Sequence, residues 1–441
     1  MDHALPRLVG EDVQVPCADG HQRRYVNLDY AASTPMMADV WEAVEAFVPY
    51  YSSVHRGTGY KSQIATDAFE DARHDVARFV GARPSDHVVF VRNTTEAINV
   101  LAAALPAGTR VLSSPVEHHA NMLPWRKHDV RLLPFTRSPE HLLEATEAAL
   151  RSSPTDLLAV TGASNVTGEV WPLAELAALA HRFGAQLLVD AAQLAPHRAI
   201  DMAATGIDYL ALSGHKLYAP LGAGALVGRM PDDGEPLLHG GGAIELVTLD
   251  DVIWLDAPDR FESGSPNVIG VVALAAACRQ LLRVGMDTIA AHERLAVRYL
   301  WDRLATVPGL ELYSLWPGDS TDRIGVATFN LDGYRDPLLA AILSAEYGIG
   351  VRHGCFCAHP LMAELRGYDD DDMREFAAAI RAPGPNPHHP GAVRASIGVG
   401  TTAADIDRLV AALHSIERFG PRSEYAYDGE HDEYSPRALA A

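Results

Sequence analysis

The chain has 441 residues, of which 48% are hydrophobic and 21% charged, and its 36 Lys and Arg against 57 Asp and Glu give a formal charge of −21. This composition indicates a globular protein with room for two hydrophobic cores, and the charge disfavours nucleic acid or an anionic membrane as a general partner. Met1 to Gly20 lacks the basic start and apolar run of a signal peptide, and no stretch has the roughly 18 apolar residues of a membrane span.

The four cysteines, Cys17, Cys278, Cys355 and Cys357, are too few and too scattered for a disulfide framework. Cys355 and Cys357 also lack the two-residue gap usual in zinc sites and dithiol redox pairs, so we expect no metal site. The sequence therefore predicts a reduced, cytoplasmic protein.

Short apolar runs alternate with helical patterns along the first two thirds of the chain. Leu173, Leu176, Ala177 and Ala180 have helical spacing, Gly184 can end that helix, and a strand follows. Strands separated in this way predict a mainly parallel sheet, whose ligands collect at the carboxyl ends of the strands. The expected strands are His87–Val91, Arg110–Leu112, Leu157–Thr161, Gln186–Val189, Tyr209–Leu212 and Gly224–Val227.

The pattern changes near Arg279–Leu300, which we expect to be one long connecting helix before a smaller α/β region. We therefore divide the chain into an N-terminal segment (1–25), a large domain (26–295), a small C-terminal domain (296–420) and a flexible tail (421–441). Within the small domain, charge repulsion in Gly367–Met373 and the proline and glycine of Ala382–Pro390 predict two mobile segments.

Two strand ends carry ionisable groups with separate chemical uses. Lys216 follows the strand Tyr209–Leu212, where a buried lysine is costly unless it is neutral, paired or covalently bound, so it is a candidate for a Schiff base or simply a lysine that reaches solvent. Asp190 follows the strand that ends at Val189, and it can either pair with a pyridinium nitrogen or cap a turn.

Two further strand ends offer hydroxyls and imidazoles. Thr94 and Thr95 open a helix after Val91, where they can bind a phosphate or only cap the helix. Glu117, His118 and His119 come after Leu112, and an imidazole there can stack on a planar ring. A lysine for an imine, an aspartate for a ring nitrogen, hydroxyls for a phosphate and a histidine for stacking together meet the needs of pyridoxal 5'-phosphate.

These residues stand within motifs that resemble the class V aminotransferase fold of pyridoxal-phosphate enzymes, and within it the group II cysteine desulfurases and selenocysteine lyases. The resemblance extends over about Asn27 to Leu413. It implies fold type I, with a mainly parallel seven-stranded sheet in the large domain and a smaller C-terminal α/β domain. The motifs include NLDYAAST, VRNTTEAINV, VEHHANMLPW, ASNVTGEV, VDAAQLAP, LSGHKLYAPLGAGAL, RFESGSPN, RHGCFCAHPLM and VRASIGVG.

The resemblance assigns a role to each matching position. Lys216 is the covalent cofactor lysine, Asp190 the partner of the pyridine nitrogen, and Gln193 a donor to the ring hydroxyl. His118 stacks on the ring and is also a catalytic residue that can move protons. The remaining cofactor contacts are assigned to Thr94, Thr95, Asn165, Ser213, His215 and Ser265, and the substrate contacts to Arg394, Asn165 and Arg352. Ser265 replaces the usual threonine and would reach the phosphate from a neighbouring subunit, which implies a homodimer.

Cys357 falls on the position of the family's nucleophilic cysteine, which accepts sulfur as a persulfide while L-cysteine becomes L-alanine. His353 and His359 are its possible helpers. Cys355 stands where better-known members often have histidine, and three roles remain open: relay of the persulfide, protection of it as an internal disulfide, or filling of space.

Cys357 and Arg394 are 394 − 357 = 37 positions apart, a longer connection than is typical of group II enzymes. It is a candidate lid, a docking surface for a sulfur-acceptor protein, or a sign of a bulkier amino-acid substrate. The alternatives to a desulfurase are therefore an epimerase, a carbon–sulfur lyase or an aminotransferase of the same fold, and a non-catalytic cofactor-binding scaffold.

Overall fold

A computed structural model describes residues 5–318, 321–382, 390–429 and 431–437. Internal contacts divide the chain into two compact units, each assembled from separate stretches of sequence. Unit 1 comprises residues 1–9, 33–163 and 170–290, and unit 2 comprises residues 10–32, 164–169 and 291–441. The segment Ser164–Glu169, which carries Asn165, therefore belongs to unit 2 although unit 1 surrounds it in sequence.

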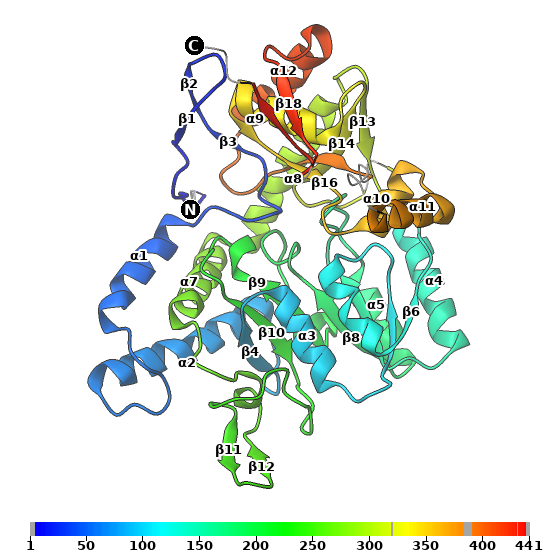
Figure 1. Ribbon diagram of the computed structural model, residues 1–441. Coiled ribbons are helices and arrows are strands. Elements are labelled where there is room, and N and C mark those ends of the chain that lie inside the picture. Colours follow the sequence, from blue (N-terminus) through cyan, green and yellow to red (C-terminus); the bar gives the residue numbers. More distant parts are fainter. Residues whose placement is uncertain (1–4, 319–320, 383–389, 430, 438–441) are drawn as a thin grey trace. The chain divides into compact units, whose positions relative to one another are not determined.

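Unit 1 is built on a seven-stranded sheet with the order β4-β10-β9-β8-β7-β5-β6, and β10 alone runs antiparallel to its neighbours (Figure 1). This architecture confirms the predicted mainly parallel α/β sheet. The strands of the sheet are β4 (His87–Val91), β5 (Arg110–Ser113), β6 (Asp129–Leu132), β7 (Leu157–Thr161), β8 (Gln186–Asp190), β9 (Tyr209–Ser213) and β10 (Gly224–Gly228).

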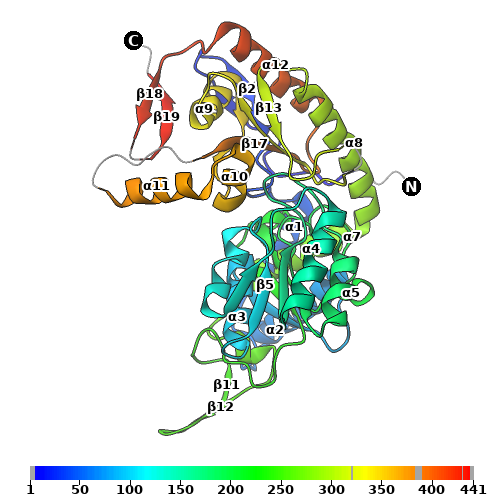
Figure 2. The ribbon, with the colours of Figure 1, turned by 90° about the vertical axis from the view of Figure 1, so that its right-hand side faces the viewer.

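Helices cover both faces of this sheet, with α3 on one face and α4 and α5 on the other (Figure 2). The face under α3 is filled by aliphatic side chains of the helix and of the central strands, such as Ile98, Leu101, Leu157 and Leu188. A hairpin of β11 (Ile244–Val247) and β12 (Val252–Trp254) projects from the unit. The helices of unit 1 are α1 (Ala38–Phe47), α2 (Tyr60–Val80), α3 (Thr94–Ala104), α4 (Pro139–Ser152), α5 (Leu173–Arg182), α6 (Met202–Thr205) and α7 (Val268–Val284).

The prediction of a single helix over Arg279–Leu300 is wrong. The structure has α7 and then α8 (Met286–Leu304), which are separated by Gly285 in a conformation with φ of +92°. Glycine adopts this backbone region without a Cβ clash, so it can end one helix before the next begins. Among the described residues no single helix has the length and apolar content of a membrane span.

Unit 2 has a four-stranded antiparallel sheet with the order β13-β14-β17-β16, which packs with its helices around Phe329, Leu343, Val393 and Leu409. The helices are α9 (Asp336–Tyr347), α10 (His359–Arg366), α11 (Asp370–Arg381) and α12 (Ala403–Phe419), in addition to most of α8. The strands are β1 (Gln14–Pro16), β2 (Gln22–Arg24), β3 (Val26–Asn27), β13 (Leu310–Tyr313), β14 (Val326–Leu331), β15 (Ile349–Gly350), β16 (Arg352–Gly354), β17 (Ala392–Ser396), β18 (Tyr425–Asp428) and β19 (Glu433–Pro436).

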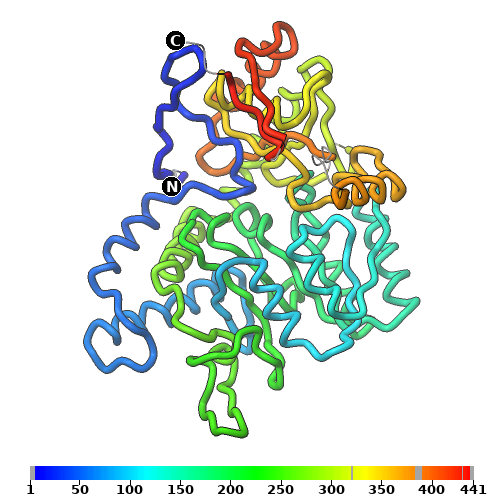
Figure 3. Tube along the Cα trace, viewed as in Figure 1, coloured from blue at the N-terminus to red at the C-terminus, as the bar shows by residue number. Residues whose placement is uncertain are grey.

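Two segments that were expected to be loose are regular. The acidic run Gly367–Met373 ends α10 and starts α11, because Asp369 caps the helix and forms a reciprocal capping box with Asp372. The chain trace follows this pair of helices after the cysteine motif (Figure 3). The tail contains the hairpin β18–β19, which packs on α9. Of the proline-rich segment Ala382–Pro390, residues 383–389 lie outside the described part of the chain.

A buried ion pair ties α2 to the sheet of unit 1. Both amine groups of the Arg73 guanidinium donate to the carboxylate of Glu262, at 2.6 and 2.7 Å, and Phe90 N–H donates to the same carboxylate at 2.5 Å. The Arg73 and Glu262 side chains are only 11% and 7% exposed, respectively. The guanidinium also lies over the rings of Phe69 and Phe90.

We predict that Arg73→Met lowers the free energy of unfolding by about 3–5 kcal/mol, because it leaves the Glu262 carboxylate buried without its counter-charge. The double variant Arg73→Met/Glu262→Gln should recover much of this loss, since the uncompensated charge is then removed. Urea denaturation of the three proteins measures both effects. Equal losses in the single and double variants would contradict this account.

Candidate functional site

The predicted strand-end residues lie at one edge of the sheet in unit 1. The register pairs Thr161 with Asp190 and Asp190 with Ala211 in the parallel strands β7, β8 and β9. In the antiparallel ladder, Gly224 pairs with both Ser213 and Val91. The ends of β4, β8 and β9 are thus brought together, as expected of a parallel sheet whose loops hold a ligand.

Hydroxyl groups gather at the start of α3. Thr94 N–H donates to Ser213 Oγ at 2.7 Å, and the Thr94 and Ser213 hydroxyls lie 2.8 Å apart. Only one of these hydroxyls can donate to the other, so one hydroxyl proton remains for a ligand. Asn93 caps the helix by accepting from Glu96 N–H, whereas Thr95 is exposed at the helix N-terminus, where the helix dipole favours an anion.

Gly224 allows these strand ends to approach closely. A Cβ at Gly224 would lie 2.6 Å from the Leu212 carbonyl oxygen and 2.9 Å from the Asn93 Cα. Any larger residue would push β10 away from β9 and from the turn that begins α3. The glycine-rich run after Lys216 therefore positions the hydroxyl cluster.

Asp190 is buried at the end of β8, and its Oδ1 accepts a hydrogen bond from Ala192 N–H at 3.0 Å. Burial raises the pKa of this carboxyl group, and the nearby charge of Lys216 opposes the shift. A cationic ring nitrogen would offset the same electrostatic cost, so Asp190 suits the pyridine nitrogen of pyridoxal phosphate. Gln193 is buried three positions farther along the chain.

His215 is neutral in the folded protein, because burial and the neighbouring Lys216 lower its pKa to about 4. A neutral imidazole can still donate one N–H to a phosphate oxygen. Its backbone carbonyl accepts hydrogen bonds from Thr34 N–H at 2.8 Å and from the hydroxyls of Ser33 and Thr34. These bonds fix the turn η4 (Gly214–Lys216), which carries both His215 and Lys216.

A series of buried hydrogen bonds joins residues that neighbour His118 in sequence. Trp125 Nε1–H donates to Asn121 Oδ1 at 3.1 Å, and Asn121 Nδ2 donates to Glu117 Oε2 at 2.7 Å. Thr161 N–H donates to the other oxygen of Glu117 at 3.0 Å. Burial raises the pKa of Glu117 well above 4.5. The neighbouring His118 caps the turn η2 (His119–Asn121), its Nδ1 accepting from Ala120 N–H.

Ser265 is exposed in the segment between Phe261 and α7. This exposed position leaves its hydroxyl available to another molecule, as the predicted intersubunit role requires. The role itself stays a prediction.

In unit 2, Arg394 is the buried centre of the predicted substrate site. It lies on β17 and is 3% exposed. Its guanidinium donates to the Asn165 carbonyl at 2.9 Å and to Asp29 Oδ1 at 3.2 Å. Burial lowers its pKa to about 10, so the group is still charged at neutral pH. Its Nε–H has no partner among the described residues and remains available to a carboxylate.

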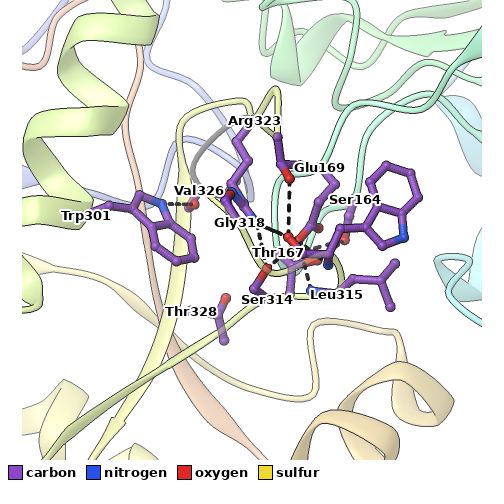
Figure 4. A network of polar contacts seen from close by, with 12 residues as sticks. Ser164, Thr167, Glu169, Trp301, Ser314, Leu315, Gly318, Arg323, Val326 and Thr328 are labelled. Carbon is purple, nitrogen blue, oxygen red and sulfur yellow. Dashed lines mark hydrogen bonds and ion pairs between the residues drawn. The ribbon is translucent and has the colours of Figure 1, made fainter. Parts of the chain in front are cut away.

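Asn165 lies in the short segment Ser164–Glu169, which hydrogen bonds fix to other parts of unit 2. Its side-chain amide donates to the Phe356 carbonyl at 2.7 Å, so it contacts the cysteine motif directly. The segment ends at Glu169, whose buried carboxylate accepts from Leu315 N–H at 2.8 Å and pairs with Arg323 (Figure 4). Thr328 Oγ1 donates to the Val166 carbonyl at 2.5 Å.

The cysteine motif forms a tight turn between β16 and α10. Cys357 is exposed and Cys355 is half-buried. Of the neighbouring basic residues, Arg352 lies 3.7 Å from Asp29 and His353 lies 4.0 Å from Asp336. His359 starts α10, and burial lowers its pKa.

The structure adds four residues to the site that the sequence analysis did not name, and it gives Glu117 a role as an acceptor. The contacts of Asp29, Glu169 and Phe356 join residues distant in the chain, which residue spacing does not reveal, whereas Asn121 contacts residues four positions away on either side. The four added residues are Asp29, Asn121, Glu169 and Phe356. The only signal was their position within the family motifs.

The family described as Aminotransferase class-V matches residues 26–409. A cysteine desulfurase of Dickeya dadantii is 39% identical over 406 residues, which cover 89% of this chain and 92% of that protein. A cysteine desulfurase of Salmonella typhimurium is 37% identical over 410 residues, with coverage of 89% and 93%.

Solved structures similar to this chain are also cysteine desulfurases. An apo cysteine desulfurase from Thermococcus onnurineus has a TM-score of 0.78 at 31% identity and covers 89% of this chain and 95% of its own. The cysteine desulfurase CsdA of Escherichia coli has a TM-score of 0.74 at 31% identity, with coverage of 88% and 94%. These similarities confirm the predicted fold and the predicted resemblance to cysteine desulfurases.

We predict that Glu117→Gln lowers the free energy of unfolding by about 1–3 kcal/mol despite its equal size. Trp125 forces Asn121 Nδ2 to face residue 117 as a donor, and a glutamine amide there would oppose it with a second donor. The exchanged pair Glu117→Gln/Asn121→Asp restores one acceptor for each donor and should be more stable than Glu117→Gln. Urea unfolding midpoints provide the test. An exchanged pair that is no more stable than the single variant would refute the fixed order of donors and acceptors from Trp125 through Asn121 to residue 117.

Proposed function

The chain belongs to the aminotransferase class-V family, and we propose that within it the protein is a cysteine desulfurase that uses pyridoxal 5'-phosphate. It transfers the sulfur of L-cysteine to Cys357 as a persulfide and releases L-alanine. The observation that carries this proposal is the exposed Cys357, held in unit 2 in a turn anchored by Asn165 and lying close enough to Arg394 to interact with its charge.

Unit 1 supplies the groups that would hold the cofactor. Lys216 would bind it covalently and Asp190 would pair with its ring nitrogen. Thr95, Ser213 and His215 offer the neutral donors that suit a phosphate at a helix N-terminus. When bound, pyridoxal phosphate supplies an electron sink for bond cleavage around the amino-acid carbon atoms.

Unit 2 supplies the groups that act on the amino acid. Of the five N–H donors of Arg394, the Asn165 carbonyl and Asp29 each engage one, and the free Nε–H is part of the fork that binds a carboxylate bidentately. The Cys357 thiolate of this unit would attack the sulfur atom, whereas Lys216, which belongs to unit 1, would remove and return protons at the substrate. Because Cys357 is exposed, an acceptor protein can collect the sulfur from it.

We place this reaction in the cytoplasm, where thiols such as the four free cysteines stay reduced. We also propose a homodimer in which Ser265 completes the neighbouring phosphate site. The projecting hairpin β11–β12 supports this proposal, since it exposes Leu246, Val247, Leu249 and Ile253 by 50% or more each. Apolar side chains gathered on a projecting element are typical of an interface.

We predict that purified protein forms L-alanine from L-cysteine in the presence of a thiol reductant, and that Cys357→Ser reduces this to background. Lys216→Ala should abolish both the activity and the visible absorbance band of the bound cofactor, whereas Cys17→Ala, which removes a buried thiol, should retain both.

The outcomes separate the alternatives. Full alanine formation by Cys357→Ser would reject the persulfide mechanism. A protein that keeps its absorbance band but forms no alanine, even with an acceptor present, would instead indicate a bulkier amino-acid substrate.

We predict that Leu249→Asp/Ile253→Asp converts the dimer to a monomer, because it places two charges in the proposed apolar interface. Light scattering of the purified variant gives the mass directly. Leu295→Asp is the matched control, since Leu295 is 74% exposed on α8 and outside the hairpin. A double variant that stays dimeric would remove the hairpin from the interface.

A further inference from the structure

The two cysteines of the motif flank a backbone turn of unusual conformation. Ala358 N–H donates to the Cys355 carbonyl at 3.0 Å, and Phe356 and Cys357 both have φ of +54°. Two consecutive positive φ values define a turn that normally contains asparagine and glycine. Residues with a side chain at such positions cost about 1–3 kcal/mol each, so the surroundings must hold this turn in place.

Contacts to Phe356 hold the turn. Its carbonyl accepts from Asn165 Nδ2 at 2.7 Å, its ring lies 4.9 Å from the Arg394 guanidinium, and the residue is 8% exposed. On the preceding side, Gly354 N–H donates to Asp336 Oδ2 at 3.0 Å. Phe356 is therefore held in a buried position, and Cys355 and Cys357 flank it in the sequence.

This conformation places the Cα atoms of the two cysteines within the range that a disulfide spans. A residue with helical dihedral angles of either hand separates the Cα atoms on its two sides by about 5.4 Å, as follows from the radius and rise of an α-helix. Disulfides span Cα separations of about 4.4–6.8 Å. An extended Phe356 would instead separate these atoms by about 7 Å, beyond that range. The left-handed Phe356 thus brings Cys355 within reach of Cys357.

We propose that Cys355 is a resolving thiol for the persulfide on Cys357, an inference that rests on the proposed desulfurase function. The Cys355 sulfur attacks Sγ of Cys357, the bond from Cys357 Sγ to the outer sulfur breaks, and a Cys355–Cys357 disulfide forms. The outer sulfur leaves as hydrosulfide and takes up the Cys355 proton. The outer sulfur is reduced while the two cysteines become oxidised, so no external oxidant is needed.

The exposures of the two residues fit these roles. Cys357 is exposed and can meet the substrate or an acceptor, whereas Cys355 is half-buried. Cys17 and Cys278 are buried at 6% and 0% exposure and are remote from this turn in sequence. A dithiol reductant then restores the two free thiols, so sulfide release depends on the supply of that reductant.

The test is a single turnover without oxygen or reductant, with less than one equivalent of L-cysteine per active site. After acid quenching and thiol alkylation, trypsin cleavage at Arg352 and Arg366 yields one peptide that carries both Cys355 and Cys357. We expect hydrosulfide equal to alanine, and a peptide that lacks two hydrogen atoms and carries no alkyl group. Cys17→Ala should behave in the same way.

Cys355→Ser and Cys355→Ala should form alanine but release no hydrosulfide, and their peptide should carry one additional sulfur atom. The inference is overturned if the unaltered protein forms alanine, keeps the additional sulfur and releases no hydrosulfide. Absence of alanine in every protein would overturn the proposed function and this inference together, because no persulfide would then form. The alanine measurement therefore distinguishes the two failures.

Discussion

The buried guanidinium of Arg394 is the contact on which the organisation of unit 2 depends. It bonds to the Asn165 carbonyl and to Asp29, and it lies over the ring of Phe356. These partners come from three stretches of chain that are far apart in sequence. Since a buried cation is costly without partners, each stretch must be in place for Arg394 to be buried. The proposed carboxylate site and the position of the cysteine turn thus share one charged group.

Burial sets the protonation states at the strand ends of unit 1. It lowers the pKa of His215 and raises those of Asp190 and Glu117. A neutral imidazole, hydroxyl donors and a buried carboxyl group beside a lysine are the result, and this combination suits a ligand that carries both a phosphate and a basic ring nitrogen.

The core of unit 1 was predictable because its strands are buried on both faces and therefore read as continuous apolar runs. β4 and β7 begin and end at the predicted residues. β6 was missed, since Asp129–Leu132 is a partly exposed edge strand with no apolar run. The break at Gly285 was missed because the apolar pattern continues on both sides of it, although a glycine within a helix pattern is a possible end.

The sequence suggested the residue types of the candidate site but not its contacts. Lys216, Asp190 and Cys357 stand in local motifs, whereas the bond from Asn165 to Phe356 joins residues 191 positions apart. The capping box at Asp369 is local, yet the four consecutive aspartates were interpreted as a repulsive run. At a helix N-terminus the same charges are favourable.

The discontinuous composition of unit 2 also determines the order in which it can be completed during synthesis. β3 pairs with β15, and Val26 and Ile349, which face each other there, are separated by 349 − 26 = 323 positions. At about 5–20 residues per second, the ribosome needs roughly 15–65 s to span that interval. During this interval the early segment 10–32 lacks the partner strand of β3, while residues 33–163 and 170–290 of unit 1 are being made. The earliest part of the chain is thus among the last to reach its native contacts, so its exposed backbone must be kept from pairing elsewhere until the final third has been translated.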